Sequence, residues 1–364
     1  VRLMEAEGVT FRTGTAVGED VSTEELRREY DAVLLCCGAG QPRDLKLPGR
    51  DAEGVYFAVD YLTAATRHLL DGTPAIDAKG KHVVIVGGGV TGAAVGYGLA
   101  KRGVKTCLVD AVPTFSRASR ANMGLIWCQS KALGCPQFVR WGFASSRAYG
   151  KLAAELKELS GIDTGYAPTG GIIPCLGEAE LEARAQFIEK LRVETEDGTY
   201  PASVLSRKEL EGMLPKVPFG PEVSGGIWSD MDGYVDPLHL MFAFRKSFVR
   251  LGGTLFAGER VSEVKPSGKG YAVVCGGRTL ECGKAVLAAG LGVRKLAAQL
   301  GTDIPVFPNK SQVMLLERIP ADVLPIPLLG IARTFGGTVM IGAAHENMGM
   351  DRRLTPEVLA ANAQ

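Results

Sequence analysis

The sequence predicts an α/β fold organised around a parallel sheet, and three observations within residues 82–110 lead to that prediction. First, the apolar run at 83–86 has the composition of a strand that is buried on both faces. Second, the glycine pattern G-x-G-x-x-G follows directly at 87–92, where a helix begins. Third, another apolar run at 106–109 ends at Asp110. A strand, glycine turn, helix and strand in this order are typical of a Rossmann-type dinucleotide-binding unit.

Each part of this unit has a mechanical purpose. Gly87 permits the tight turn, Gly89 lets a pyrophosphate approach the backbone, and Gly92 lets the helix press against the strand. The pyrophosphate would lie at the helix N-terminus, where unpaired N–H groups and the helix dipole favour an anion. Asp110 would accept hydrogen bonds from an adenosine ribose, and its charge would repel the 2′-phosphate of NADP. The motif alone does not choose between FAD and NAD.

A membrane span is the competing interpretation of this stretch, because residues 83–100 carry no charge over 18 positions. Six of those positions are glycines, however. The dinucleotide motif accounts for them, and lipid packing does not.

Composition narrows the class of protein. A chain of 364 residues can hold two domains or one large α/β enzyme. Its 41 basic and 40 acidic residues nearly cancel, so no nucleic-acid partner is implied. Eight cysteines without a C-x-x-C pair argue against a metal site or a disulfide framework, and a cytoplasmic location is the default expectation. We expect no signal peptide, and we expect both ends, Val1 and Gln364, to be cut from a longer chain.

The first quarter of the chain resembles the glutamate synthase small subunit and its relatives, which are pyridine-nucleotide-dependent flavoproteins. The matching phrases are LMEAEGVTFRT, YDAVLLCCGAGQPRDLKLPGR, GVYFAVDYL and IDAKGKHVVIVGGGVTG. The resemblance implies that residues 38–40 would lie against a flavin and that the loop at 87–92 would hold NADPH. Residues 1–78 are therefore expected to be a partial flavoprotein segment.

The chain after Gly92 resembles a different family, that of D-amino-acid oxidase, glycine oxidase and D-amino-acid dehydrogenase. The matching phrases are AAVGYGLAKRGVKTCLVDAVPTFSRASRANMG, MDGYVDPLHLMFAFRKSFVRLGG and KAVLAAGLGVRKL. The resemblance implies an FAD site formed by Gly87, Gly89, Val90, Thr91, Gly92, Asp110, Ala111, Arg117, Ala118, Ser119, Asn122, Met123, Gly124, Val261 and Gly290. The residue types agree independently, since hydroxyl, guanidinium and backbone N–H groups suit an anionic diphosphate.

Arg333 is the candidate for substrate recognition. Two apolar runs around residues 335–337 predict a β-hairpin, and Arg333 lies on its first strand. The resemblance implies that Arg333 holds the substrate carboxylate, for which a planar, permanently charged guanidinium is suited. An exposed strand arginine is the alternative. His345 and Glu346 are expected to be surface turn residues first and pocket residues second.

These observations predict a Rossmann-type FAD-binding domain (79–135 and 231–300) interleaved with an α+β substrate domain (136–230 and 301–364) whose C-terminal end is truncated. The predicted reaction is FAD-dependent oxidation of an amino acid or a related amine acid, such as a D-amino acid or glycine, to the imine. The electron acceptor and the oligomeric state stay open, and a membrane or protein acceptor is possible. Two alternatives remain: an NADPH-dependent electron-transfer flavoprotein, and an inactive, flavin-free fragment.

Overall fold

The structure is a computed structural model that describes residues 21–22, 28, 80–111, 118–129, 135–194, 200–351 and 353–363. The chain divides into two compact units, Val1–Lys46 and Leu47–Gln364. Every helix and strand given below belongs to the second unit. The predictions for residues 1–78 fall almost wholly outside the described residues, and Arg117 lies outside them too.

A four-stranded parallel sheet carries the glycine motif and confirms the predicted α/β class. Its strand order is β12-β1-β2-β8, with every neighbouring pair parallel. The bounds are β1 (Val83–Val86), β2 (Thr106–Asp110), β8 (Thr254–Ala257) and β12 (Lys284–Leu287). Helix α4 (Val90–Lys101) connects β1 to β2, as the spacing predicts, and Gly103 follows it with φ 73°.

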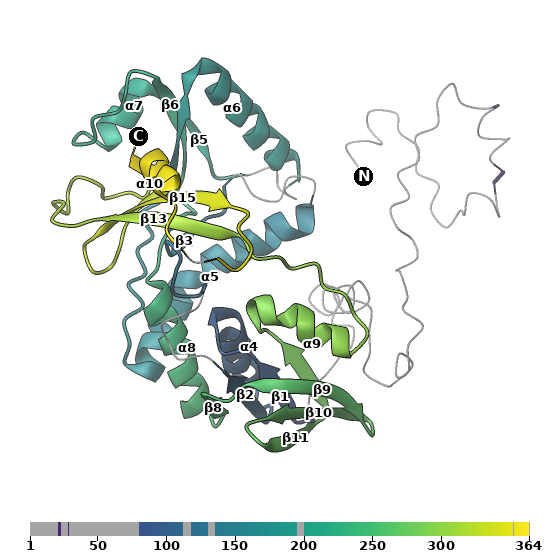
Figure 1. The fold of residues 1–364 in the computed structure, drawn as a ribbon. Coiled ribbons are helices and arrows are strands. Elements are labelled where there is room, and N and C mark those ends of the chain that lie inside the picture. The colour runs from purple at the N-terminus through teal and green to yellow at the C-terminus, as the bar shows by residue number, and fades with distance from the viewer. Residues whose placement is uncertain are drawn as a thin grey trace. The chain divides into compact units, whose positions relative to one another are not determined.

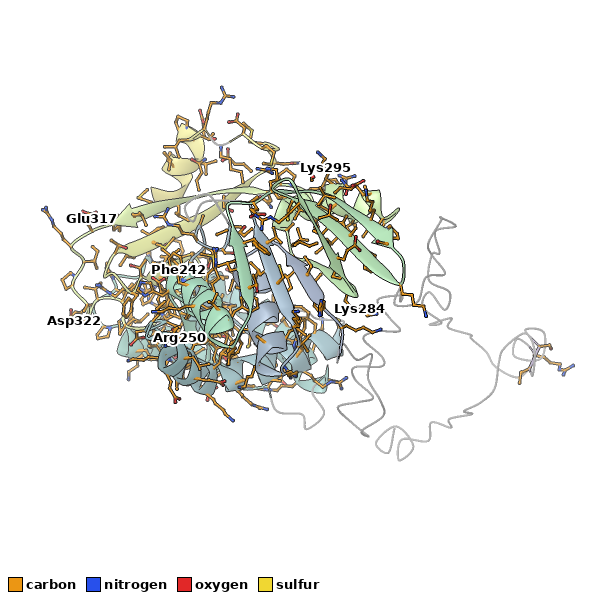
Figure 2. All side chains as sticks on the ribbon, turned by 90° about the horizontal axis from the view of Figure 1, so that it is seen from below. Phe242, Arg250, Lys284, Lys295, Glu317 and Asp322 are labelled. Atoms are coloured by element: carbon orange, nitrogen blue, oxygen red, sulfur yellow. The ribbon has the colours of Figure 1, made fainter. Side chains whose placement is uncertain are left out.

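The two faces of this sheet are covered differently, and alternation along β1 decides which residue meets which layer. Val83 and Ile85 pack with Ala100 of α4 and Phe248 of α8 (Pro237–Arg250). Val84 and Val86 pack instead against an antiparallel sheet. That sheet consists of β9 (Val261–Ser267), β10 (Gly270–Cys275) and β11 (Arg278–Cys282). Both layers can be followed in Figure 1 and in the side-chain view of Figure 2. Because both faces are covered, the sequence of β1 is a continuous apolar run.

The segment 83–100 is therefore a strand, a turn and a helix, and not a single apolar helix. Among the helices of the described residues, none is long and apolar enough to cross a lipid bilayer.

A second layered part contains two further groups of antiparallel strands. One group has the order β4-β6-β5, and the other has the order β13-β15-β14. Leu328 connects them through isolated bridges to Ile172 and Ile331. The bounds are β4 (Gly171–Leu176), β5 (Ser203–Ser206), β6 (Val223–Ser229), β13 (Lys310–Leu316), β14 (Ile331–Arg333) and β15 (Val339–Glu346). The pairing of Arg333 with Val339 across the turn confirms the predicted hairpin.

Helices cover both faces of the β4-β6-β5 group. Helix α6 (Gly177–Glu194) packs on the face of Ile173 and Ile227, and α7 (Arg207–Met213) packs on the face of Ile172. A capping box of Ser206 and Glu209 starts α7. Helix α10 (Pro356–Ala363) follows β15.

Helices α5 and α8 connect the two layered parts (Figure 1). Helix α5 (Pro136–Ser160) places Leu156 in one core cluster with Phe244 of α8. Asp236 caps α8 by accepting a hydrogen bond from the His239 N–H at 2.8 Å, and Pro237 occupies the first turn. Strand β3 (Leu125–Ile126) pairs with β7 (Gly233–Tyr234). This ladder lies next to the start of α8, because only Val235 separates β7 from the cap residue Asp236.

Candidate functional site

The glycine turn after β1 is shaped by contacts that leave no room for side chains. Gly87 has φ 106°, and a Cβ built on it would lie 2.4 Å from the carbonyl oxygen of Ala288. A Cβ on Gly92 would lie 1.8 Å from the carbonyl oxygen of Gly87. The first glycine therefore makes the turn, and the third lets α4 press against β1, as the motif predicts.

The N-terminus of α4 faces a serine hydroxyl. Gly89 is the N-cap residue and supplies no side-chain cap. Instead, the Val90 N–H donates a hydrogen bond to Ser119 Oγ at 3.0 Å. A Cβ on Gly89 would lie 2.8 Å from that same oxygen. Val90 and Thr91 form the first turn of α4. The Ser119 hydroxyl oxygen therefore lies at the helix N-terminus, where the motif predicts a pyrophosphate oxygen.

Asp110 is the last residue of β2. Because β1 and β2 are parallel, it lies at the same end of the sheet as the glycine turn that follows β1. This residue is 5% exposed, and its Oδ2 lies 3.3 Å from Nη1 of Arg245 on α8. Ala111 follows directly. Arg245 was not among the site residues predicted from the sequence. A signal was present, because the apolar stripe of α8 (Met241, Phe244, Phe248) has a charged residue beside it at this position.

The segment 118–124 forms a turn that is held by Asn122. Its Nδ2 donates to the carbonyl of Ala118 at 3.0 Å, and its Oδ1 accepts from the N–H of Gly124 at 2.9 Å. Gly124 has φ 69°, and a Cβ there would lie 2.0 Å from the carbonyl oxygen of Val235. The Val235 N–H donates back to the Gly124 carbonyl at 2.9 Å. Met123 is half-buried beside this junction.

Val261 and Gly290 reach the same region from later segments. Val261 begins β9 and packs with Val84 and Val109 of the parallel sheet. Gly290 follows β12 and starts a short 3-10 helix, η1 (Gly290–Gly292), with φ 55°. The Ala288 N–H, just before it, donates to the Val86 carbonyl at 2.8 Å. Asp110 thus ends β2, Gly290 follows the carboxyl end of β12, and Val261 shares a core cluster with Val86 of β1 and Val109 of β2.

Residues 232–235 tie this region to the antiparallel part, and they were not predicted from the sequence as site residues. Asp232 is 2% exposed and accepts hydrogen bonds from the Cys128 N–H and from Gln129 Nε2. Burial raises the pKa of its carboxyl to about 6, against the lowering effect of those hydrogen bonds. Tyr234 is buried, and its hydroxyl accepts the N–H of Phe335 in the hairpin turn at 3.1 Å. Burial raises the pKa of Tyr234, so its hydroxyl keeps its proton at neutral pH.

Arg333 lines a cavity of about 250 Å³ together with Tyr234 and Phe335. Its Nη1 donates to the Gly337 carbonyl at 2.7 Å, and its Nη2 donates to the carbonyls of Ile319 and Pro320. These bonds stabilise the hairpin turn and the loop beside it. A carboxylate that bound both terminal nitrogens would have to replace these carbonyls, so the substrate role of Arg333 stays a prediction.

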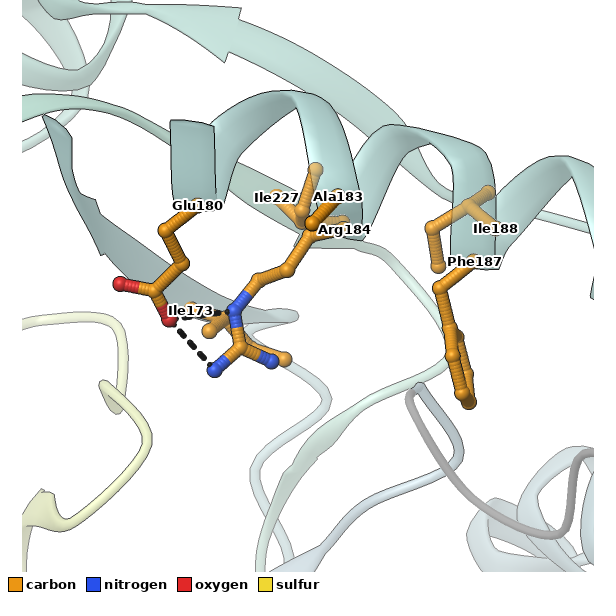
Figure 3. Close-up of a pocket in the computed structure, with 7 residues that line it drawn as sticks. All are labelled: Ile173, Glu180, Ala183, Arg184, Phe187, Ile188 and Ile227. Carbon is orange, nitrogen blue, oxygen red and sulfur yellow. Dashed lines mark hydrogen bonds and ion pairs between the residues drawn. The ribbon is translucent and has the colours of Figure 1, made fainter. Parts of the chain in front are cut away.

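Another cavity, of about 420 Å³, lies between α6 and the β4-β6-β5 sheet (Figure 3). Its lining is apolar except for one ion pair, in which Arg184 Nε donates to Glu180 at 2.9 Å. None of the predicted cofactor residues lines it.

The expectation that Glu346 is a surface turn residue is wrong. Glu346 ends β15 and forms an ion pair with Lys310 at 3.0 Å, and both side chains are about nine-tenths buried. His345 lies on the same strand.

The residues at the parallel sheet fit the adenosine diphosphate half of FAD. The glycine turn presents backbone N–H groups at the start of α4 without side chains that would shield them, and the Ser119 hydroxyl already accepts the N–H of Val90 there. Asp110 offers a carboxylate at the position that the motif assigns to the ribose. In the described residues, no group of three histidine, cysteine or acidic side chains could hold a metal ion.

Comparisons with known proteins agree with this geometry. Residues 82–364 match the family described as FAD dependent oxidoreductase, and residues 1–127 match the family described as pyridine nucleotide-disulphide oxidoreductase. The chain is 33% identical to an opine oxidase subunit of Agrobacterium tumefaciens (strain Ach5) over 282 residues, which cover 77% of this chain and 75% of the relative.

Two further relatives match the two resemblances separately. The crystal structure of glycine oxidase from Geobacillus kaustophilus superposes with a TM-score of 0.70 at 26% identity, covering 77% of this chain and 75% of that one. The glutamate synthase [NADPH] small chain of Bacillus subtilis (strain 168) is 48% identical over 97 residues, which are 26% of this chain and 20% of that protein. Both resemblances seen in the sequence are confirmed, and so is FAD as the cofactor. The chain therefore belongs to the family of FAD-dependent oxidoreductases that also includes glycine oxidase.

Proposed function

We propose that this FAD-dependent oxidoreductase oxidises an amino acid, with a free or N-substituted amino group, at the bond between Cα and nitrogen. The observation that carries the proposal is the turn between β1 and α4. Close backbone contacts at Gly87 and Gly92 form the bend of a dinucleotide-binding motif, and the Ser119 hydroxyl faces the N-terminus of α4. The opine oxidase subunit and glycine oxidase, the relatives that the chain matches over three quarters of its length, support the substrate class.

The proposed reaction removes two electrons and two hydrogens from the substrate. The Cα hydrogen leaves as hydride and an amino proton leaves to solvent, which gives an imine that water hydrolyses to an oxo acid and an amine. When bound, FAD supplies the flavin ring that accepts the hydride. The protein contributes position, and orientation of this kind can lower a barrier by several kcal/mol.

The described residues would divide this task along the cofactor. Backbone N–H groups of the glycine turn and the Ser119 hydroxyl would hold the diphosphate, and Asp110 would accept the adenosine ribose. The turn at 118–124 would meet the flavin. Its hydrogen bond with Val235 connects that end to Tyr234 and the hairpin, which supports a substrate site between these segments. Val261 and Gly290 would close the adenine side and the flavin side.

Arg333 is the proposed partner of the substrate carboxylate. Two observations bear on this role: it lines a cavity large enough for a small amino acid, and its guanidinium already serves three carbonyls. The proposal therefore requires Arg333 to exchange at least one carbonyl for the ligand.

The test is a visible spectrum of the purified full chain, followed by anaerobic titration. We expect the bands of oxidised flavin, and we expect glycine, a D-amino acid or an N-(1-carboxyethyl) amino acid to bleach them under nitrogen. Reoxidation by air compared with an artificial dye would then identify the class of electron acceptor. Bleaching by NADPH and by none of the amino acids would support the electron-transfer alternative, and a colourless chain that takes up no FAD would support the inactive fragment.

A further inference from the structure

The ion pair between Arg245 and Asp110 joins two of the least exposed charged side chains in the described residues. The exposed fractions of the two side chains are 12% and 6%, and the N–O distance is 3.3 Å. Removing two charges from water is costly, so a buried ion pair is weak support for stability by itself. A pair placed in a cofactor motif is better explained by what it orients.

The surroundings of Asp110 leave its carboxylate little freedom. A Cβ on Gly88 would lie 2.8 Å from Asp110 Oδ2, so the carboxylate packs directly beneath the glycine turn. Its backbone is fixed as well, because the Asp110 carbonyl accepts the N–H of Gly258 at 2.8 Å. Arg245 approaches from α8, an element far along the chain from the rest of the motif.

Helix α8 contacts both ends of the proposed cofactor site. Its cap, Asp236, follows Val235, whose N–H donates to the Gly124 carbonyl in the turn assigned to the flavin. Arg245 lies nine residues further along, which is about 14 Å at the rise of an α-helix. One rigid element therefore links the flavin turn to the ribose aspartate.

We propose that Arg245 is a positioning residue for FAD: it orients the Asp110 carboxylate toward the adenosine ribose and so makes binding depend on the ribose 2′-hydroxyl. A carboxylate has about four lone-pair positions. Asp110 can therefore accept from the guanidinium and from the ribose together. The inference rests on the ribose role proposed for Asp110.

The experiment compares two ligands on the full chain after removal of flavin. Dissociation constants are measured by flavin fluorescence for FAD and for its analogue lacking the adenosine 2′-hydroxyl. We expect the wild type to prefer FAD by about tenfold or more, the effect of one charge-assisted hydrogen bond. Arg245→Met and Asp110→Asn should each reduce this preference to about twofold or less.

Arg250→Met is the matched control, because Arg250 lies on the same helix (Figure 2) and donates to the Leu159 carbonyl instead. It should keep the wild-type preference. A purely structural Arg245 would weaken both ligands equally and lower the melting temperature. Arg245→Lys keeps a charge opposite Asp110 and should fold even if Arg245→Met does not, yet it should lose most of the preference because it lacks the guanidinium fork.

The outcomes distinguish the ribose role of Asp110 from the positioning role of Arg245. A wild type that binds both ligands equally would overturn the ribose role of Asp110 and this inference with it. A wild type that prefers FAD, together with Arg245→Met or Arg245→Lys variants that prefer it just as strongly, would overturn the role of Arg245 alone.

Discussion

The glycine turn after β1 and the hairpin that carries Arg333 were both predicted as parts of one site, yet the sequence specifies them by different means. In the glycine turn, the function lies in the backbone: a Cβ on Gly92 would come within 1.8 Å of the Gly87 carbonyl oxygen. In the hairpin, the function depends on a long side chain that donates to three carbonyls, one in its own turn and two in the loop at 319–320. The spacing of glycines can be read directly from the sequence. The partners of a long side chain cannot, because it can bind several different groups.

The largest effect is expected where backbone contact is closest. Gly92→Ala should lower the free energy of unfolding by about 3 kcal/mol or more, because the added Cβ forces β1 and α4 apart. It should also abolish FAD binding. Chemical denaturation and the flavin absorbance of the purified chain measure both.

Gly98→Ala on the same helix is the control, since its Cβ would meet only Arg102 Nη1 at 3.7 Å. This change should be neutral or stabilising by up to about 1 kcal/mol, with FAD retained. Equal behaviour of the two variants would show that the turn does not depend on close packing.

The hairpin side is tested by Arg333→Met. Loss of three hydrogen bonds to carbonyls should lower the free energy of unfolding by about 2 kcal/mol. If Arg333 also holds the substrate carboxylate, KM of the flavin-loaded enzyme should rise by about tenfold or more. Steady-state kinetics and denaturation separate the two effects.

Arg207 offers a matched comparison, because it also donates to three carbonyls, those of Phe219, Gly220 and Val223. Arg207→Met should lower stability to a similar extent and leave KM unchanged. An Arg333→Met variant with unchanged KM would reduce Arg333 to the same structural role.

The smallest effect is expected at Ser119, because its side chain contacts the turn through one hydroxyl. Ser119→Ala removes the acceptor of the Val90 N–H and should lower stability by about 1 kcal/mol or less. FAD binding should weaken by a few fold if the hydroxyl also contacts the diphosphate. Ser206→Ala removes a comparable cap from α7 and should leave FAD binding unchanged. The same FAD affinity in both variants would place Ser119 outside the cofactor site.

Local signals in the sequence were enough to predict the elements of the nucleotide-binding part. It predicted β1, the glycine turn, α4, β2 and the hairpin around residues 335–337, and the structure confirms each. The physical reason is that strand burial, glycine turns and helix caps depend on neighbours within a few residues, so their signals are local.

Contacts between side chains that lie far apart in the sequence follow only from the packing of the whole fold. Arg245 reaches Asp110 from 135 positions later in the chain, Tyr234 accepts the N–H of Phe335, and Glu346 is buried against Lys310. Periodicity places such residues on a face but does not name their partners, because a guanidinium, a hydroxyl or a carboxylate can be satisfied in many ways. The packing of helices and sheets selects one of those ways.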